Sequence, residues 1–210
     1  PPHEPIGGRT VRLDPLNPAE HATALTKAFL ESPDELWTYL PWGPYSNSED
    51  TEGEVASMIE SLLDLPRWQS YALIVNGHAL GMASYLRINP SSGSIEIGGI
   101  CFSSALQQTT AATEALYLLI KRAFALGFRR CEWKCDALNG PSRTAAERLG
   151  FEYEGTFRKA SHYKQRSRDT AWFAIIDTDW PALNSRFSTW LSPDNFGPDG
   201  TQLKRLHDLA

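Results

Sequence analysis

The residues best suited to chemistry stand at the start of a predicted helix in the middle of the chain. They are small or polar: Gln107, Gln108, Thr109, Thr110, Ala111, Ala112 and Thr113. The first turn of a helix leaves backbone N–H groups without partners, and the helix dipole adds partial positive charge. Such an end binds phosphate oxygens without any basic side chain. An ordinary amphipathic helix with threonines near its start is the alternative explanation.

A second polar motif, Asn139-Gly140-Pro141-Ser142, lies downstream of that helix. Proline suits the first turn of a helix, and a glycine at position 150 suits its end. Asn139 and Ser142 therefore stand at the start of a short second helix. They either serve there as turn and capping residues or contact a ligand above the helix.

These motifs, in this order, resemble those of the GNAT acetyltransferase superfamily, in particular the branch of the ribosomal-protein-alanine N-acetyltransferases. The resemblance is carried by Gln107 and Ala112, by Asn139 and Ser142, and by the closing Leu-Gly-Phe at 149–151. It implies an acyl-CoA-dependent N-acyltransferase with acetyl-CoA as co-substrate. The backbone amides of residues 107–113 would hold the CoA pyrophosphate, although Thr110 stands where the family usually has glycine.

The resemblance also implies an α+β fold, with a mixed, mostly antiparallel, splayed sheet flanked by helices. The pantetheine arm of CoA would lie in the opening of the sheet, against the backbone of Ile100, Cys101 and Phe102. Asn139 would hold the pantetheine or an ordered water, and Ser142 would hydrogen-bond the departing thiolate. Many members have a tyrosine seven residues after this asparagine, but the residue here is Ala146, which cannot donate a proton.

Glu96 is our candidate general base. Acetyl transfer needs a neutral amine, and deprotonating a lysine-like amine at pH 7 costs about 4–5 kcal/mol, whereas an α-amine costs about 1 kcal/mol. A carboxylate, acting directly or through water, can take that proton. Glu96 lies on a predicted strand that leads into the phosphate turn, on the face opposite Ile95 and Ile97. A structural carboxylate paired with an arginine is the alternative.

An aromatic stretch between the first two predicted helices is our candidate acceptor site. Its side chains Trp37, Tyr39, Trp42 and Tyr45 would wall a pocket, because aromatic rings attract cations and flat ligands. Packing in the core is the alternative for each of them. A basic run at 164–168 joins the last two predicted strands, and we expect a solvated loop there, with ligand contact as the alternative.

Periodicity and turn residues predict the elements that position these side chains. Strands are expected over 9–13, 68–75, 79–88, 94–102, 152–160 and 169–177, with a further strand between the two central helices. Helices are expected over 18–29, 48–63, 107–126 and 180–191, besides the short one after Asn139. Asn76-Gly77 predicts a hairpin turn, and residues from 193 onward predict a turn-rich extension over the surface.

Length and composition fit one acetyltransferase domain over 1–210, with a core at 8–180 and a C-terminal helix and tail at 181–210. The net charge of −5 argues against a nucleic-acid partner. No apolar run is long enough for a membrane helix and the N-terminus lacks a signal pattern, so we expect no membrane partner and a cytoplasmic protein. Cys101, Cys131 and Cys135 form no ligand set with histidines, and we expect buried thiols and no metal.

The sequence therefore predicts an N-acetyltransferase whose acceptor is a small-molecule amine or a peptide N-terminus. Two other readings stay open. The donor could be a longer acyl-CoA, or a GNAT-like protein could bind CoA or an amine without turnover. A homodimer is compatible with the sequence.

Overall fold

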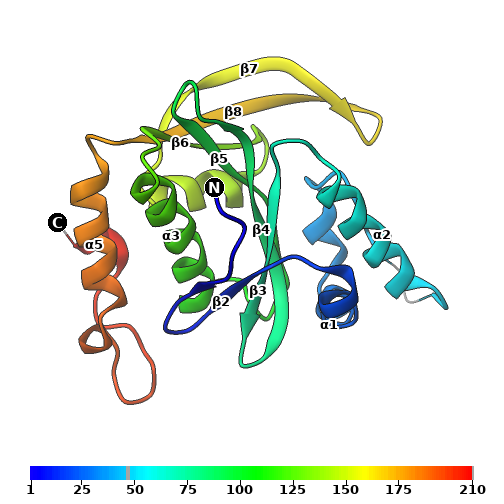
Figure 1. Ribbon diagram of the computed structural model, residues 1–210, viewed down its shortest axis with the longest axis horizontal. Coiled ribbons are helices and arrows are strands. Elements are labelled where there is room, and N and C mark those ends of the chain that lie inside the picture. The colour runs from blue at the N-terminus through cyan, green and yellow to red at the C-terminus, as the bar shows by residue number, and fades with distance from the viewer. Residues whose placement is uncertain (46–47, 210) are drawn as a thin grey trace.

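The computed structural model describes residues 1–45 and 48–209, and its described strands form one eight-stranded sheet (Figure 1). The strands are β1 (Ile6–Gly7), β2 (Arg12–Pro15), β3 (Gln69–Val75), β4 (His78–Asn89), β5 (Ser94–Phe102), β6 (Arg130–Asp136), β7 (Glu152–Tyr163) and β8 (Arg166–Ile176). Their order across the sheet is β1-β2-β3-β4-β5-β6-β8-β7. Among the described pairs, β5 and β6 run parallel and the others antiparallel. The mixed, mostly antiparallel sheet is confirmed.

Helices cover both faces of this sheet (Figure 1). They are α1 (Pro18–Leu30), α2 (Thr51–Leu63), α3 (Thr110–Ala125), α4 (Gly140–Arg148) and α5 (Trp180–Leu191), with 3₁₀ turns at Asp34–Trp37, Pro193–Asn195 and Leu206–Asp208. One core cluster joins α1 and α2 to the sheet, and a larger cluster joins α3, α4 and α5 to the opposite face. Burial is nearly continuous along β4 and β5, so both faces of the central strands are covered.

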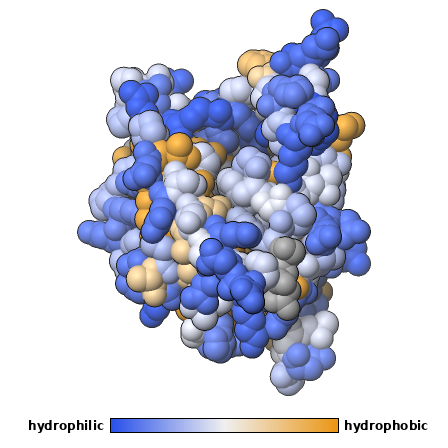
Figure 2. Space-filling model, turned by 90° about the vertical axis from the view of Figure 1, so that its right-hand side faces the viewer, coloured by the Kyte–Doolittle hydropathy of each residue, from blue (hydrophilic) through white to orange (hydrophobic). Residues whose placement is uncertain are grey.

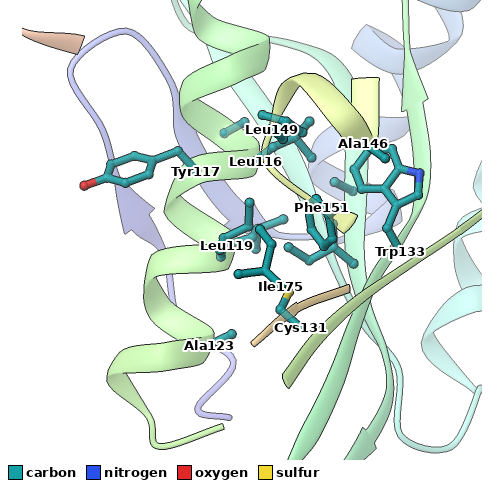
Figure 3. Packing of buried hydrophobic residues seen from close by; sticks show 14 of the residues in the cluster. Leu116, Tyr117, Leu119, Ala123, Cys131, Trp133, Ala146, Leu149, Phe151 and Ile175 are labelled. Atoms are coloured by element: carbon teal, nitrogen blue, oxygen red, sulfur yellow. The ribbon is translucent and has the colours of Figure 1, made fainter. Parts of the chain in front are cut away.

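The larger cluster fixes the two helices that carry the polar motifs. In Figure 3, Leu116 and Leu119 of α3 point toward Phe151, Trp133 and Ile175, whereas Tyr117 points to the other side of its helix. That side meets α5, where Tyr117 stacks on Phe187 with ring centroids 5.1 Å apart. The starts of α3 and α4 are thereby held at fixed positions beside the sheet.

The sheet is splayed between β5 and β6. The two strands are paired only from Ser94 to Ile97 on β5 and from Arg130 to Trp133 on β6. Beyond Ile97, β5 continues to Phe102 and stays paired with β4 alone. The backbone of the last residues of β5 therefore faces an opening, as the resemblance implied.

Local signals set several element ends as expected. Asn17 caps α1 through its side-chain oxygen, which accepts from the Ala19 amide at 3.0 Å. Gly127, with φ of 85°, follows the end of α3, where glycine tolerates the left-handed region. Asn139 caps α4 by accepting from the Ser142 amide at 3.1 Å.

Other boundaries differ from the prediction. Helix α3 begins at Thr110 rather than at 107, because the Gln107 amide donates to Ser103 in a turn and Gln108 has φ of 60°. Helix α2 begins at Thr51 rather than at 48. The first predicted strand appears as β2, shifted to Arg12–Pro15, and is preceded by the unpredicted strand β1.

The basic run at 164–168 is not a loop. Strands β7 and β8 continue to Tyr163 and from Arg166, so a tight turn at Lys164 and Gln165 joins them, and both residues have positive φ. The resulting long hairpin arches over the side of the sheet that carries α1 and α2 (Figure 1). Arg166 and Arg168 of the basic run therefore lie on strand β8 and not in a loop.

The C-terminal tail packs on α5 instead of extending over the surface. Leu206 is 2% exposed and belongs to the larger core cluster. Asn195 is buried and donates to the carbonyls of Trp190 and Lys204. Residue 210 of the predicted tail lies outside the described residues.

Hydrophilic residues predominate on the side that carries α1 and α2, where hydrophobic ones gather in small separate patches (Figure 2). Across the described helices, length and apolar content fall short of what a bilayer-spanning segment requires. All three cysteines are buried free thiols, as predicted.

Candidate active site

A cavity of about 480 Å³ lies where β5 parts from β6. Its walls include Ile97–Ile100 of β5 and Trp133–Asp136 of β6, which are the residues at and beyond the last strand pairing. The β7–β8 hairpin and residues 39–42 close it from the side of α1 and α2. At the tip of the hairpin, the Lys164 ammonium donates to the Trp37 carbonyl at 2.7 Å and so ties these two covers together.

The start of α3 stands at the end of the same opening. Among the described residues, the backbone amides of Gln108, Thr109 and Thr110 donate no hydrogen bond, as expected for the first turn of a helix. Thr109 is the N-cap and accepts from the Ala112 amide at 3.1 Å. Free amides of this kind, together with the helix dipole, would suit an anion.

The remaining residues of the predicted phosphate turn have other partners. Gln107 donates from its side chain to the Phe102 carbonyl at 2.9 Å and so ties the turn to the end of β5. The side chains of Ala111, Ala112 and Thr113 are buried in the body of the protein, at most 7% exposed. A ligand at this turn would therefore meet their backbone and not their side chains.

The three residues expected to contact pantetheine lie on the unpaired part of β5. Cys101 and Phe102 pair with Met82 and Gly81 of β4, which leaves the strand edge toward β6 open. Ile100 lines the cavity. The Cys101 side chain points into the smaller core cluster, and burial raises the pKa of its thiol well above the ordinary value. Cys101 would thus contribute backbone and no thiol chemistry.

Glu96 lies in the cavity wall, only 4% exposed, and forms ion pairs with Arg87 and with Lys134. Its neighbour across the parallel pairing is Glu132, and the Lys134 ammonium bridges the two carboxylates, 3.2 Å from Glu96 and 3.0 Å from Glu132. The structure therefore combines both interpretations of Glu96, a carboxylate in the cavity and a carboxylate paired with an arginine.

Lys134 is a site residue that the sequence interpretation missed. Its side chain is 5% exposed, and its ammonium lies 3.4 Å from the centre of the Trp172 ring. Burial lowers its pKa to about 8; Glu132 opposes that shift and Arg87 adds to it. The available signal was a lysine within a predicted strand, two residues after Glu132, but its partners in the cavity wall come from β5 and β8.

Asn139 and Ser142 both line the cavity at the start of α4. Because Asn139 caps the helix, Ser142 is not needed as its cap. The Ser142 oxygen accepts from the Trp133 indole at 3.1 Å, and its hydroxyl hydrogen faces the Cys135 sulfur, with which Ser142 forms a hydrogen bond. Ala146, where many relatives would have tyrosine, is fully buried in the core (Figure 3).

The predicted aromatic wall is divided between cavity and core. Tyr39 and Trp42 line the cavity, and the Tyr39 hydroxyl donates to the Leu138 carbonyl at 3.0 Å. Trp37 is 1% exposed and packs edge-on against Phe29, with ring centroids 5.2 Å apart. Tyr45 packs edge-on against Trp37, and burial raises its pKa to about 12. Trp37 and Tyr45 therefore support the wall from behind.

The hairpin adds two further cavity residues that sequence reasoning did not assign, Arg168 and Trp172. They are four residues apart on β8 and face the same side of the sheet. Part of the signal was visible, since Arg168 belongs to the basic run. The run was placed in a loop because its strand pairing with β7 depends on residues distant in sequence.

No cluster of histidine, cysteine or acidic side chains suited to a metal ion occurs among the described residues. The candidate site thus combines a helix start with free amides, an opening between strands, and a cavity lined by two ion-paired carboxylates, three cations and a serine hydroxyl.

Comparison with known proteins places this geometry in context. Residues 10–152 match the family described as acetyltransferase (GNAT) domain. A GCN5-related N-acetyltransferase from Brucella melitensis is 38% identical with a TM-score of 0.94, over 99% of this chain and 94% of that one. A probable GNAT-family acetyltransferase from Chromobacterium violaceum is 39% identical with a TM-score of 0.80, over 87% of this chain and 90% of that one. No curated protein matches the sequence significantly.

A more distant structure shares the fold. RimL, a ribosomal-protein alpha-N acetyltransferase in complex with coenzyme A, is 23% identical with a TM-score of 0.70, over 82% of this chain and 98% of that one.

Proposed function

The chain belongs to the GNAT acetyltransferase family, and from this premise we propose that it moves the acetyl group of acetyl-CoA to a primary amine of a small molecule or a peptide N-terminus. It is an acyl-CoA-dependent acyltransferase. The observation that carries the proposal is continuity. The free amides at the start of α3, the opening between β5 and β6, and the cavity with Glu96 and Ser142 follow one another.

The residues present fit acetyl-CoA, which supplies the activated acetyl group. The amides of Gln108, Thr109 and Thr110 suit its pyrophosphate. The open edge of β5 at Ile100 offers backbone to an amide-containing arm, next to Phe102, whose carbonyl already accepts from Gln107. Thr110, which replaces the usual glycine, is compatible with this role because it has helical conformation and sits at the first position of α3.

Glu96 takes the proton of the acceptor amine, directly or through water. Its place in the cavity wall supports this role. Arg87 and Lys134 already donate to its oxygens, so the acceptor amine has to compete with two cations for them. That setting suits an α-amine, whose deprotonation at pH 7 costs about 1 kcal/mol, better than an alkylamine, which costs about 4–5 kcal/mol.

Ser142 stabilises the departing thiolate. Its oxygen accepts from Trp133, and its hydroxyl hydrogen would turn from the Cys135 thiol to the departing thiolate, which is the stronger acceptor because it is charged. Asn139 orders the turn from which Ser142 projects. Tyr39 and Trp42 flank the acceptor on the opposite wall.

Thiol release in the presence of acetyl-CoA and a panel of amines tests the proposal. We expect release that requires both substrates, with mass spectrometry showing one acetyl group on the amine nitrogen. Binding of CoA without thiol release on any amine would favour a binding protein. Faster turnover with a longer acyl-CoA would favour a different donor.

A further inference from the structure

Arg168 is a cation without an ion-pair partner at the cavity wall, and its guanidinium lies 5.8 Å from the centre of the Tyr163 ring. No described carboxylate lies within ion-pairing distance of its guanidinium, and its Nε is buried with no hydrogen-bond acceptor. Arg166, two residues away on the same strand, is by contrast paired with Asp136 at 2.6 Å. Burying an uncompensated charge and an unpaired donor costs free energy, so such a group usually meets a ligand or a solvent molecule.

Trp172 adds a second unused donor on the same face of β8. Its indole Nε1 is buried without an acceptor, and its side chain lines the same cavity. The ring itself is held in place, because the Lys134 ammonium lies over it and Phe157 packs against it with centroids 4.8 Å apart. Arg168 and Trp172 therefore present fixed N–H groups to the cavity.

The carboxylates of the cavity are already occupied. Glu96 is paired with Arg87 and Lys134. Asp136 accepts from the Leu138 amide, from Tyr163 and from Arg166. The described cavity wall thus offers donors and positive charge to a ligand and no free carboxylate to balance Arg168, in a protein whose net charge is −5.

We propose that Arg168 and Trp172 bind a carboxylate of the acceptor, so that the substrates are amines that also carry a carboxylate. This inference rests on the proposed acetyl transfer. The planar guanidinium can form two parallel hydrogen bonds to a carboxylate. The indole N–H is a donor and not an acceptor, so it suits a carboxylate oxygen as well. The carboxylate is either that of a free amino acid or an acidic side chain beside the N-terminus of a peptide.

Matched acceptor pairs test the proposal. The first pair is an amino acid and its amide, and the second is a peptide amide with Asp or Asn as the second residue. Within each pair the carboxylate is removed, and rates are compared per neutral amine, because a neighbouring carboxylate also raises the pKa of the amine. Wild-type protein should prefer the carboxylate member of at least one pair by about 10- to 100-fold in kcat/KM, the range for hydrogen bonds to charged groups. The pair that shows the preference identifies the source of the carboxylate.

Arg168→Gln should abolish that preference by lowering kcat/KM for the carboxylate member, and it should leave the Kd of CoA within about twofold. Arg158→Gln removes the same charge from an exposed position of β7 outside the cavity wall and should keep the preference. Equal turnover within both pairs by wild-type protein overturns the proposal. So does a loss of CoA affinity in Arg168→Gln, because the arginine would then serve the cofactor.

Calorimetric titration of the same pairs separates this inference from the proposed reaction. If no pair releases thiol, acetyl transfer fails, but carboxylate-dependent binding that is lost in Arg168→Gln still supports the carboxylate site. If thiol is released while binding and turnover ignore the carboxylate, the reaction stands and the carboxylate site falls.

Discussion

The Lys134 ammonium lies 3.2 Å from a carboxylate oxygen of Glu96 in the wall of the cavity. The same ammonium lies 3.0 Å from Glu132, which does not line the cavity. Two carboxylates therefore share one cation, but only one of them faces the site. This relationship provides a matched pair of variants that separates a catalytic carboxylate from a structural one.

Glu96→Gln should lower kcat/KM at neutral pH about 10²- to 10⁴-fold for a strongly basic acceptor, because the proton acceptor is lost while size and most hydrogen bonding remain. A weakly basic acceptor should lose less. Raising the pH should restore part of the activity on the basic acceptor, since more of its amine is then neutral in solution. Steady-state kinetics against pH, with acceptors of different amine pKa, measure this.

Glu132→Gln is the control for that experiment. It breaks an ion pair to Lys134 of nearly the same length outside the cavity wall, so it should lower the melting temperature and keep the dependence on acceptor pKa. A stable Glu96→Gln protein with full activity on an alkylamine would show that the base lies elsewhere, or that the enzyme captures the neutral amine from solution.

Thr110→Asp should weaken CoA binding at least tenfold without loss of stability. A carboxylate in the first turn of α3 interacts favourably with the helix dipole but repels the phosphates proposed to bind there. Ala182→Asp places the same charge in the exposed first turn of α5 and should leave the Kd unchanged. Calorimetric titration with CoA measures both, and equal affinity in wild type and Thr110→Asp would remove the pyrophosphate from this turn. The buried Ala111 is a poorer position because a charge there would disturb the core.

Trp42→Ala should raise the KM of the acceptor much more than that of acetyl-CoA, because Trp42 lines the cavity on the side of residues 39–42. Trp37→Ala should instead destabilise the fold by about 3–5 kcal/mol, since the whole indole is buried between Phe29 and Tyr45. Kinetics and chemical denaturation of both variants check the contrast. Equal rises of both KM values in Trp42→Ala would assign this residue to packing as well.

Features that depend on neighbouring residues could be predicted from the sequence. Asn17 followed by Pro18 gave the start of α1, and Gly127 gave the end of α3, because caps are contacts within a few residues. The motif at Asn139 was found for the same reason. The opening between β5 and β6 came from the family resemblance, since no local pattern encodes where two parallel strands part.

Features that depend on partners distant in sequence could not be predicted. Arg168 was placed in a loop because the length of the β7–β8 hairpin is set by pairing across two strands. Lys134 pairs with Glu132 on its own strand, but its partners in the cavity wall, Glu96 and Trp172, lie on β5 and β8, and no spacing along the chain reveals those contacts. Trp37 and Trp42 belong to one aromatic stretch, and nothing in that stretch indicates which of them is buried. Trp37 faces the core because it packs against Phe29, which lies outside that stretch.

Ser142→Ala should lower kcat about 10- to 100-fold and leave the KM of acetyl-CoA nearly unchanged, because the hydroxyl is proposed to act on the thiolate, which forms during the reaction. The α4 cap is kept, since it comes from Asn139. Trp133→Phe removes the donor that orients Ser142 and keeps the hydroxyl, so its effect on kcat should be smaller. If kcat falls in Trp133→Phe but not in Ser142→Ala, packing at this position matters and the hydroxyl does not.

Asp136→Asn should destabilise the protein at pH 7 and much less at pH 3. Burial alone would raise the pKa of this carboxyl, but hydrogen bonds from the Leu138 amide, Arg166 and Tyr163 outweigh burial and lower it below the ordinary value of 3.8. A carboxyl whose pKa is lowered by folding stabilises the fold fully above the unfolded pKa, and this contribution is lost as the pH falls through the folded pKa. Asparagine keeps an acceptor for the Leu138 amide but offers no charge to Arg166.

Denaturation midpoints of wild type and variant should therefore converge as the pH falls below about 3.8. Arg166→Gln should also reduce the change in stability between pH 7 and pH 3, because it removes the cation that favours the ionised form of Asp136. A destabilisation by Asp136→Asn that is the same at both pH values would mean that this side chain acts through its shape and its bond to Leu138, and not through its charge.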